Sequence, residues 1–313
     1  MMQEIIALFT DHTVMIVTLG TTIIGFLAGS LGTFAYLREQ SLLGDVVSHA
    51  SLAGITVAFV IASLLGSASP KSTLVLVPGA IVAGTLAMLF AGAVVRHTKI
   101  KMDAAFAVAL ALFFGGGLTL MRAIMQGNYT NKAGLDSYVF GQAAAITSGD
   151  IQAISVLGIV AVSVVLLFWK EFKIYTFDPS FAKSLGFSAR ILEPLLLSTI
   201  VVSIVVGLKA VGIILMIAFV VAPAVAARQW TKRLETMIPL SGAFGAASGL
   251  LGTLTSAVLG DMPTGPMIVL FLTFFAVGSL YIAPRRGLLH RRRAFRKKRE
   301  KLMEEIATEE VQS

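Results

Sequence analysis

Nine segments of mostly apolar residues follow one another along this chain, and they limit its fold more than any other feature. A helix needs roughly 20 apolar residues to cross about 30 Å of hydrocarbon. The segments lie near residues 13–36, 46–66, 73–95, 103–125, 151–169, 191–208, 210–227, 237–258 and 264–283. We therefore predict an all-α integral membrane protein, a polytopic bundle of about nine transmembrane helices. If the chain is not divided at Gly207-Leu208-Lys209, the count is eight.

The composition supports a surface covered mostly by lipid. Charged residues make up 13% of the chain and apolar residues 56%, with a mean hydropathy of +0.86. A soluble domain usually carries about a quarter charged residues. The chain has no cysteine, which excludes disulfide frameworks and thiolate metal sites.

The basic residues predict which side of the membrane each end occupies. With the N-terminus outside, 21 of the 25 Lys and Arg residues fall on the cytoplasmic side. The positive-inside rule therefore predicts an outside N-terminus and a cytoplasmic C-terminus. We assign residues 1–284 to a transmembrane domain and residues 285–313 to a basic cytoplasmic tail. The tail is interpreted as a segment that contacts anionic lipid, and nucleic acid is not expected as a partner.

Asp45 and His49 are the clearest candidates for chemistry. Ionisable residues inside a membrane span are costly and usually functional. Residues four apart project from one face of a helix. A carboxylate and an imidazole together suit Mn²⁺, Fe²⁺ and Zn²⁺. Two copies of the chain around a two-fold axis would supply four ligands. The alternative is an Asp–His hydrogen bond that only caps and orients the second span.

A second candidate is the loop after the fifth span. Asp178 fits the N-cap of a helix, with Pro179 at the first helical position and Gly186 as the terminator. The pattern predicts a short helix outside the membrane, on the cytoplasmic side. Residues 128–150 are too polar to form a simple membrane span, and their sequence predicts a loop with a short helix.

Other patterns narrow the function or concern packing. The chain contains no Gly-x-x-x-x-Gly-Lys-[Ser/Thr] phosphate loop, so we expect it not to hydrolyse ATP itself. It also lacks His-Glu-x-x-His, the commonest zinc-protease signature, and the Gly-x-Ser-x-Gly nucleophile elbow. Gly25 with Gly29 and Gly245 with Gly249 form two GxxxG patterns. Such patterns let helix backbones approach closely, and here they are weak evidence for a specific dimer interface.

Several motifs, taken in order, resemble the ABC-3 family of metal-ion permeases. They are Leu37-Arg38, Ser41-Leu42-Leu43-Gly44-Asp45, Ser48-His49-Ala50-Ser51-Leu52-Ala53-Gly54, Lys99-Ile100-Lys101-Met102-Asp103, Phe177-Asp178-Pro179 with Ala182 and Leu185-Gly186, Gly207-Leu208-Lys209-Ala210-Val211-Gly212, Val221-Ala222-Pro223-Ala224 and Pro263-Thr264-Gly265-Pro266. The resemblance covers roughly residues 13–284. Residues 133–144 look more similar to manganese members than to zinc members. The chain departs from the family at Ala53, where many members have proline.

The resemblance implies a permease in the bacterial cytoplasmic membrane that imports manganese, zinc or iron. It implies two cytoplasmic ATP-binding subunits, a second permease that is the same chain or a paralogue, and an external metal-binding protein. It also implies that Asp45 and His49 are metal ligands of the pathway. The loop at about 171–190, with Asp178, Ala182 and Gly186, would dock on the ATPase. No permanently bound cofactor is expected, only the transported ion.

The sequence leaves three functional classes open. The leading one is an importer working by alternating access, with manganese ahead of zinc or iron. A second is a secondary metal transporter or channel that needs no ATPase. The third, an intramembrane enzyme, is disfavoured because one Asp–His pair stands without another polar cluster. Dependence on an ATPase distinguishes the first two classes, and metal competition distinguishes manganese from zinc or iron within the first.

Overall fold

The computed structural model describes most of the chain. The described residues are 12–38, 42–67, 69–70, 72–129, 132, 134–135, 138, 141–260 and 262–283. The predicted basic tail at 285–313 lies outside them, as does much of the 133–144 stretch. The predicted domain boundary at residue 284 therefore stays a prediction.

The described residues form helices joined by turns. The elements are α2 (His12–Leu37), α3 (Leu43–Leu64), α4 (Thr73–His97), α5 (Met102–Gln126), the 3₁₀ turn η1 (Ala143–Ala145), α7 (Ser148–Leu167), α8 (Trp169–Phe177), α9 (Pro179–Ser184), α10 (Ala189–Val211), α11 (Ile213–Trp230), α12 (Leu234–Leu259) and α13 (Thr264–Ile282). Each of the nine apolar segments coincides with a helix. Eight of these helices are long and apolar enough to cross a membrane, whereas the apolar part of α11 is shorter. The predicted all-α membrane fold is confirmed.

The break between the sixth and seventh segments lies further along the chain than predicted. Helix α10 continues through Gly207-Leu208-Lys209 and ends at Val211. Gly212 adopts φ +84°, a left-handed conformation that residues with a Cβ avoid. The turn therefore forms at Gly212, and Lys209 belongs to the last turn of α10.

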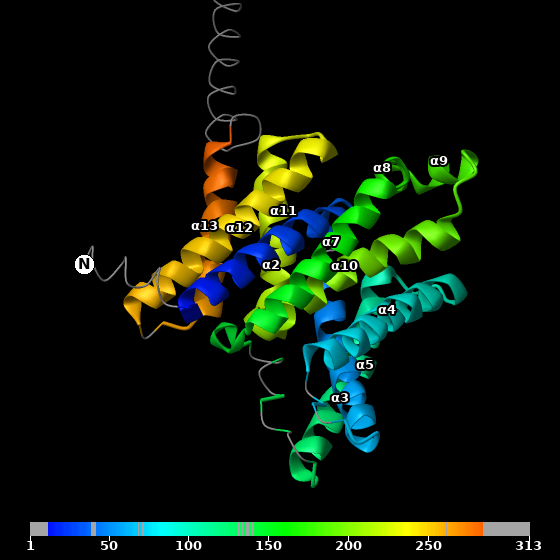
Figure 1. Cartoon of the computed structure of the whole chain (residues 1–313). Helices are drawn as coiled ribbons and strands as arrows, with labels where there is room; N and C mark the ends of the chain where they lie inside the picture. Colours follow the sequence, from blue (N-terminus) through cyan, green and yellow to red (C-terminus); the bar gives the residue numbers. More distant parts are fainter. Residues whose placement is uncertain are drawn as a thin grey trace, which may run out of the picture.

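Helix α2 occupies the centre of the bundle and packs most closely on α12 (Figure 1). A Cβ added at Gly25 would overlap the carbonyl group of Gly245, and one added at Gly249 would overlap that of Thr21. Lipid gives little hydrophobic drive to helix association, so close van der Waals packing holds such a crossing together. The two GxxxG patterns therefore face each other within one chain.

The α2–α12 crossing predicts that alanine substitutions at two glycines differ sharply in their effect on stability. Gly245→Ala is expected to destabilise the folded permease by about 1–3 kcal/mol, since its methyl group would displace the backbone of α2. Gly278→Ala on α13 is the matched control, because nothing lies within 4 Å of its added Cβ. Thermal unfolding of the two purified variants in detergent measures the difference. Equal stability of both variants would contradict the crossing.

The outer helices expose large apolar side chains. Ile159 on α7 is 66% exposed, and Phe274 on α13 is 68% exposed. In water such a surface would drive aggregation, but in a bilayer it contacts acyl chains. Helices α3, α4 and α5 form a second group that packs on α10 and α11 (Figure 1).

The helix ends meet as an alternating up-and-down order requires. Arg38, after α2, pairs with Glu193 near the start of α10, with 3.4 Å between nitrogen and oxygen. At the other end of the bundle, Asp150 near the start of α7 pairs with Lys209 near the end of α10. We call the end that carries α8 and α9 the α9 end. Its assignment to the cytoplasm stays a prediction.

Candidate metal site

Asp45 and His49 lie together on the first two turns of α3. Asp45 Oδ1 and His49 Nε2 are 3.0 Å apart. The Asp45 side chain is 29% exposed and the His49 side chain 19% exposed, so both remain reachable from one side of the helix. The predicted i, i+4 arrangement on one helical face is therefore present.

The pair lies at mid-depth in the bundle although it stands near the start of its helix. His49 packs edge-on against Phe114, with ring centroids 4.5 Å apart, and Phe114 is at the midpoint of α5. A Cβ added at Gly84, near the middle of α4, would lie 3.3 Å from Val47 Cγ1 and 3.0 Å from Val201 Cγ1. Val201 is near the middle of α10. The start of α3 therefore lies deeper in the bundle than the ends of α4, α5 and α10. Its first two turns place two ionisable groups about halfway along these helices.

The contact with Phe114 orients the imidazole. His49 Nε2 meets the carboxylate of Asp45, while Nδ1 is buried and forms no hydrogen bond with any described residue. A buried polar atom without a partner is costly, which makes this ring orientation a feature to explain. In this ring orientation Nε2, and not Nδ1, lies beside the Asp45 carboxylate. Nε2 is therefore the nitrogen that could share a metal ion with Asp45. Sequence analysis missed Phe114, because an aromatic residue in an apolar run carries no signal of its own.

One chain supplies only two ligands at this position. Among the described residues, no group of three or more His, Cys, Asp or Glu side chains is close enough to hold a metal ion. A transition metal ion commonly takes four to six ligands. A site built on Asp45 and His49 is incomplete within a single copy.

The second candidate forms the predicted short helix, α9. Asp178 Oδ1 accepts a hydrogen bond of 2.9 Å from the backbone N–H of Phe181, and Pro179 occupies the first helical position. Ala182 is buried. Gly186 ends the element with φ +87°. The preceding helix α8 was not predicted, since its mixed polar sequence shows no clear periodicity.

Three large apolar side chains in and beside α8 and α9 are exposed: Phe177 ends α8, Phe181 is in α9 and Leu185 follows α9. Phe177, Phe181 and Leu185 follow at intervals of four residues, and each is slightly more than half exposed. Exposed apolar groups of this kind are typical of surfaces that contact a protein or a membrane. Arg38 lies 5.1 Å from the ring centre of Tyr175, so α8 is held against the ends of α2 and α10.

Sequence analysis also missed a buried ion pair at the opposite end. Lys209 Nζ lies 2.6 Å from Asp150 Oδ2, and the Asp150 side chain is 5% exposed. Thr73, at the start of α4, donates to Asp150 Oδ1, and the Thr147 backbone N–H donates to Asp150 Oδ2 over 2.8 Å. The signal was the spacing Thr147-x-x-Asp150 before an apolar run, a helix-start pattern. These contacts join α4, α7 and α10.

Comparison with known proteins identifies relatives along nearly the whole chain. The ABC 3 transport family matches residues 10–283. The zinc transport system membrane protein TroC of Treponema pallidum is 43% identical over 304 residues, which cover 97% of this chain and 99% of that protein. The manganese transport system membrane protein MntC of Bacillus subtilis is 40% identical over 269 residues. That match covers 86% of this chain and 60% of that protein.

Solved structures are also similar to this chain over most of its length. PsaBC from Streptococcus pneumoniae, solved in complex with Fab, superposes with a TM-score of 0.78 at 28% sequence identity. The match covers 91% of this chain and 98% of the PsaBC chain. An inward-facing putative metal-chelate type ABC transporter shares the fold, with a TM-score of 0.61 at 16% identity. The resemblance found in the motifs is thus confirmed, and the chain belongs to the ABC 3 transport family.

Proposed function

We propose that this chain is the membrane-spanning permease of an ABC importer for a divalent metal ion, with manganese as the leading substrate. The observation that carries the proposal is the Asp45–His49 pair at mid-depth in the bundle. A carboxylate and an imidazole held at such a depth are costly without a function. Relatives named for manganese and for zinc transport support the substrate class.

The geometry of the pair suits a chelated metal ion. An octahedral ion about 2.1 Å from each ligand separates two neighbouring ligand atoms by about 3.0 Å. A tetrahedral ion at about 2.0 Å separates them by about 3.3 Å. The observed separation of 3.0 Å between Oδ1 and Nε2 is close to both. The side chains could thus receive Mn²⁺ or Zn²⁺ after a small rotation.

A second permease copy would complete the coordination. The partly exposed face of Asp45 and His49 offers two ligands, and a two-fold axis would bring two more. Shared ligands give each ion a site that opens when the two chains move apart. Binding must remain weak enough for release, which an alternating interface permits.

ATP hydrolysis is assigned to separate subunits that dock on α8 and α9. The exposed side chains of Phe177, Phe181 and Leu185 would offer the contact surface. Helix α10 starts shortly after α9, and its middle lies beside the turn of α3 that carries the pair. A movement of α9 can therefore reach the metal site through one helix. An external metal-binding protein would deliver the ion at the opposite end.

Replacing Gly186 tests this coupling. Gly186→Val forces a β-branched residue into φ +87°, which should shift α9 and uncouple ATP hydrolysis from transport while the complex still assembles. Gly66→Val is the matched control, because Gly66 has φ +70° in the turn after α3 and, like Gly186, has nothing within 4 Å of an added Cβ. The measurement is ATPase rate and metal uptake in the same proteoliposomes. Normal uptake by Gly186→Val would contradict the coupling role.

Uptake in proteoliposomes also tests the function itself. The chain reconstituted with its ATPase subunits should accumulate ⁵⁴Mn only when ATP is present. Excess unlabelled Mn²⁺ should suppress the uptake at lower concentrations than Zn²⁺ or Fe²⁺ does. Stronger suppression by Zn²⁺ would move the substrate to zinc, the second candidate. Uptake without the ATPase would instead support a secondary transporter or channel.

A further inference from the structure

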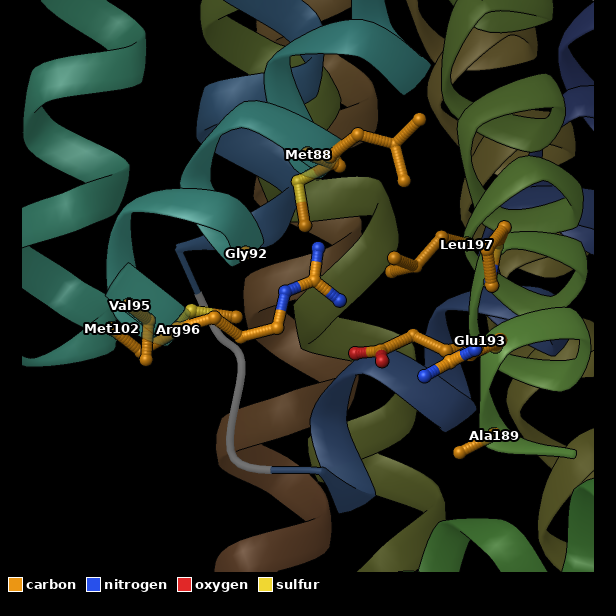
Figure 2. A pocket seen from close by; sticks show the side chains of 11 residues that line it. Met88, Gly92, Val95, Arg96, Met102, Ala189, Glu193 and Leu197 are labelled. Atoms are coloured by element: carbon orange, nitrogen blue, oxygen red, sulfur yellow. The ribbon is translucent and has the colours of Figure 1, made fainter. Parts of the chain in front are cut away.

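A cavity of about 320 Å³ lies between α4, the start of α5 and α10, at the α9 end of the bundle (Figure 2). Its charged lining residues are Arg96, Arg190 and Glu193. In Figure 2, Arg96 from α4 and Glu193 from α10 extend into the space from opposite sides. None of these residues belongs to the candidate metal site.

The cavity carries a surplus of positive charge. Glu193 is paired with Arg38, which lies outside the cavity lining, at 3.4 Å. Arg96 and Arg190 are exposed, and neither forms an ion pair or side-chain hydrogen bond with any described residue. Two unpaired guanidinium groups that line one cavity favour an anion, and the guanidinium fork matches phosphate oxygens well.

The rest of the cavity is apolar and extends into the bundle. Its wall comprises Met88, Leu89, Gly92, Val95, Met102, Ala189, Pro194 and Leu197. Arg96 is in the last turn of α4, and Met88 is about 12 Å deeper along the same helix. Leu197 is similarly about 10 Å beyond Arg190 along α10. The two arginines thus lie at helix ends, and the apolar wall extends from them toward the middle of the bundle.

We propose that this cavity binds an acidic phospholipid, with its phosphate between Arg96 and Arg190 and part of an acyl chain along the apolar wall. A free phosphate ion would satisfy the arginines but leave the apolar wall unused. A lipid satisfies both, at the depth where lipid phosphates lie. Arg190 is in the first turn of α10, shortly after Gly186, and Arg96 is in the last turn of α4. A phosphate bound to both would therefore hold the start of α10 against α4.

The test measures lipid binding to the full-length chain purified with its ATPase subunits. The delipidated complex is titrated with dioleoyl phosphatidylglycerol and with dioleoyl phosphatidylcholine, and bound lipid is counted by native mass spectrometry. Phosphatidylglycerol should bind about thirtyfold more tightly than phosphatidylcholine, because each arginine contributes about fivefold. Arg96→Gln with Arg190→Gln should abolish that preference.

Two further variants separate the charges from the apolar wall. Lys99→Gln with Lys101→Gln removes the same charge from the neighbouring α4–α5 turn and should leave the preference unchanged. Gly92→Leu projects a side chain into the cavity, since an added Cβ there meets only the end of Arg96 at 3.9 Å. It should weaken phosphatidylglycerol binding by about tenfold with both arginines intact, since 1.4 kcal/mol corresponds to tenfold in affinity.

Three results would overturn the proposal. Retention of the preference by the double arginine variant would exclude these residues as the headgroup site. Displacement of phosphatidylglycerol by millimolar inorganic phosphate, with Gly92→Leu having no effect, would assign the site to a free anion. Loss of the ATPase subunits or of a second permease from the arginine variant, with lipid binding unchanged, would assign the arginines to a protein contact.

Discussion

Replacing Asp45 by asparagine, or His49 by alanine, is expected to reduce metal uptake by at least about a hundredfold while the permease remains in the membrane. Loss of a residue that only supports a metal ligand costs about 10- to 100-fold, so loss of a ligand should cost at least as much. If the second permease is a copy of this chain, one substitution removes a ligand from each of the two copies. Asp45→Glu should retain partial uptake, since it keeps the charge and displaces it by one methylene group.

Ser48→Ala is the matched control for these variants. Ser48 lies on the same turn of α3, and its buried hydroxyl forms no hydrogen bond with any described residue. Its removal should leave ⁵⁴Mn uptake unchanged at normal abundance. If the Asp–His pair only orients α3, the damaging variants should lose folded protein in proportion to uptake. Full uptake by His49→Ala at normal abundance would exclude the metal site.

The second large effect is expected at the Asp150–Lys209 ion pair. Lys209→Met leaves a carboxylate buried without its cation, and breaking a buried pair costs about 3–5 kcal/mol. Thr73 and Thr147 would remain as donors to Asp150, but neither carries a charge. The variant should unfold at a clearly lower temperature and accumulate poorly in the membrane. Asp150→Asn combined with Lys209→Met should recover most of the loss, since no uncompensated charge remains.

Lys173→Met provides the comparison at the α9 end. Lys173 pairs with Glu235 at the same distance of 2.6 Å, but the two side chains are 44% and 54% exposed. Exposed ion pairs contribute about 0–1 kcal/mol, so burial alone should separate the two substitutions. Thermal unfolding in one detergent at one ionic strength measures both. Equal shifts would show that the Asp150–Lys209 pair is effectively hydrated.

The ion pairs that join helix ends and the candidate metal ligands lie at different depths in the bundle. Asp150 and Lys209 lie at one end of the bundle, where they join α4, α7 and α10. Arg38 and Glu193 join α2 and α10 at the α9 end. Asp45 and His49 lie between these levels, beside the middles of α4, α5 and α10. Charges that fasten helix ends are paired across helices, whereas the candidate metal ligands are paired within one turn.

The sequence by itself determined the fold class, the number of apolar helices and the identity of the candidate residues. Runs of about 20 apolar residues dictate spanning helices, because every backbone polar group in lipid must be bonded within its own segment. The cap at Asp178 and the terminator at Gly186 were also readable, since both act within a few residues. The motifs identified the family. Each of these signals is local in the chain.

Only the tertiary structure decided where those elements lie relative to one another. The GxxxG patterns of α2 and α12 could have faced another chain, and their mutual fit became visible only when both backbones were placed. The Asp45–His49 turn stands at a helix start in the sequence, yet packing brings it to mid-depth against Phe114. Asp150 and Lys209 are 59 residues apart. Their pairing depends on helix packing, which no local pattern of residues specifies.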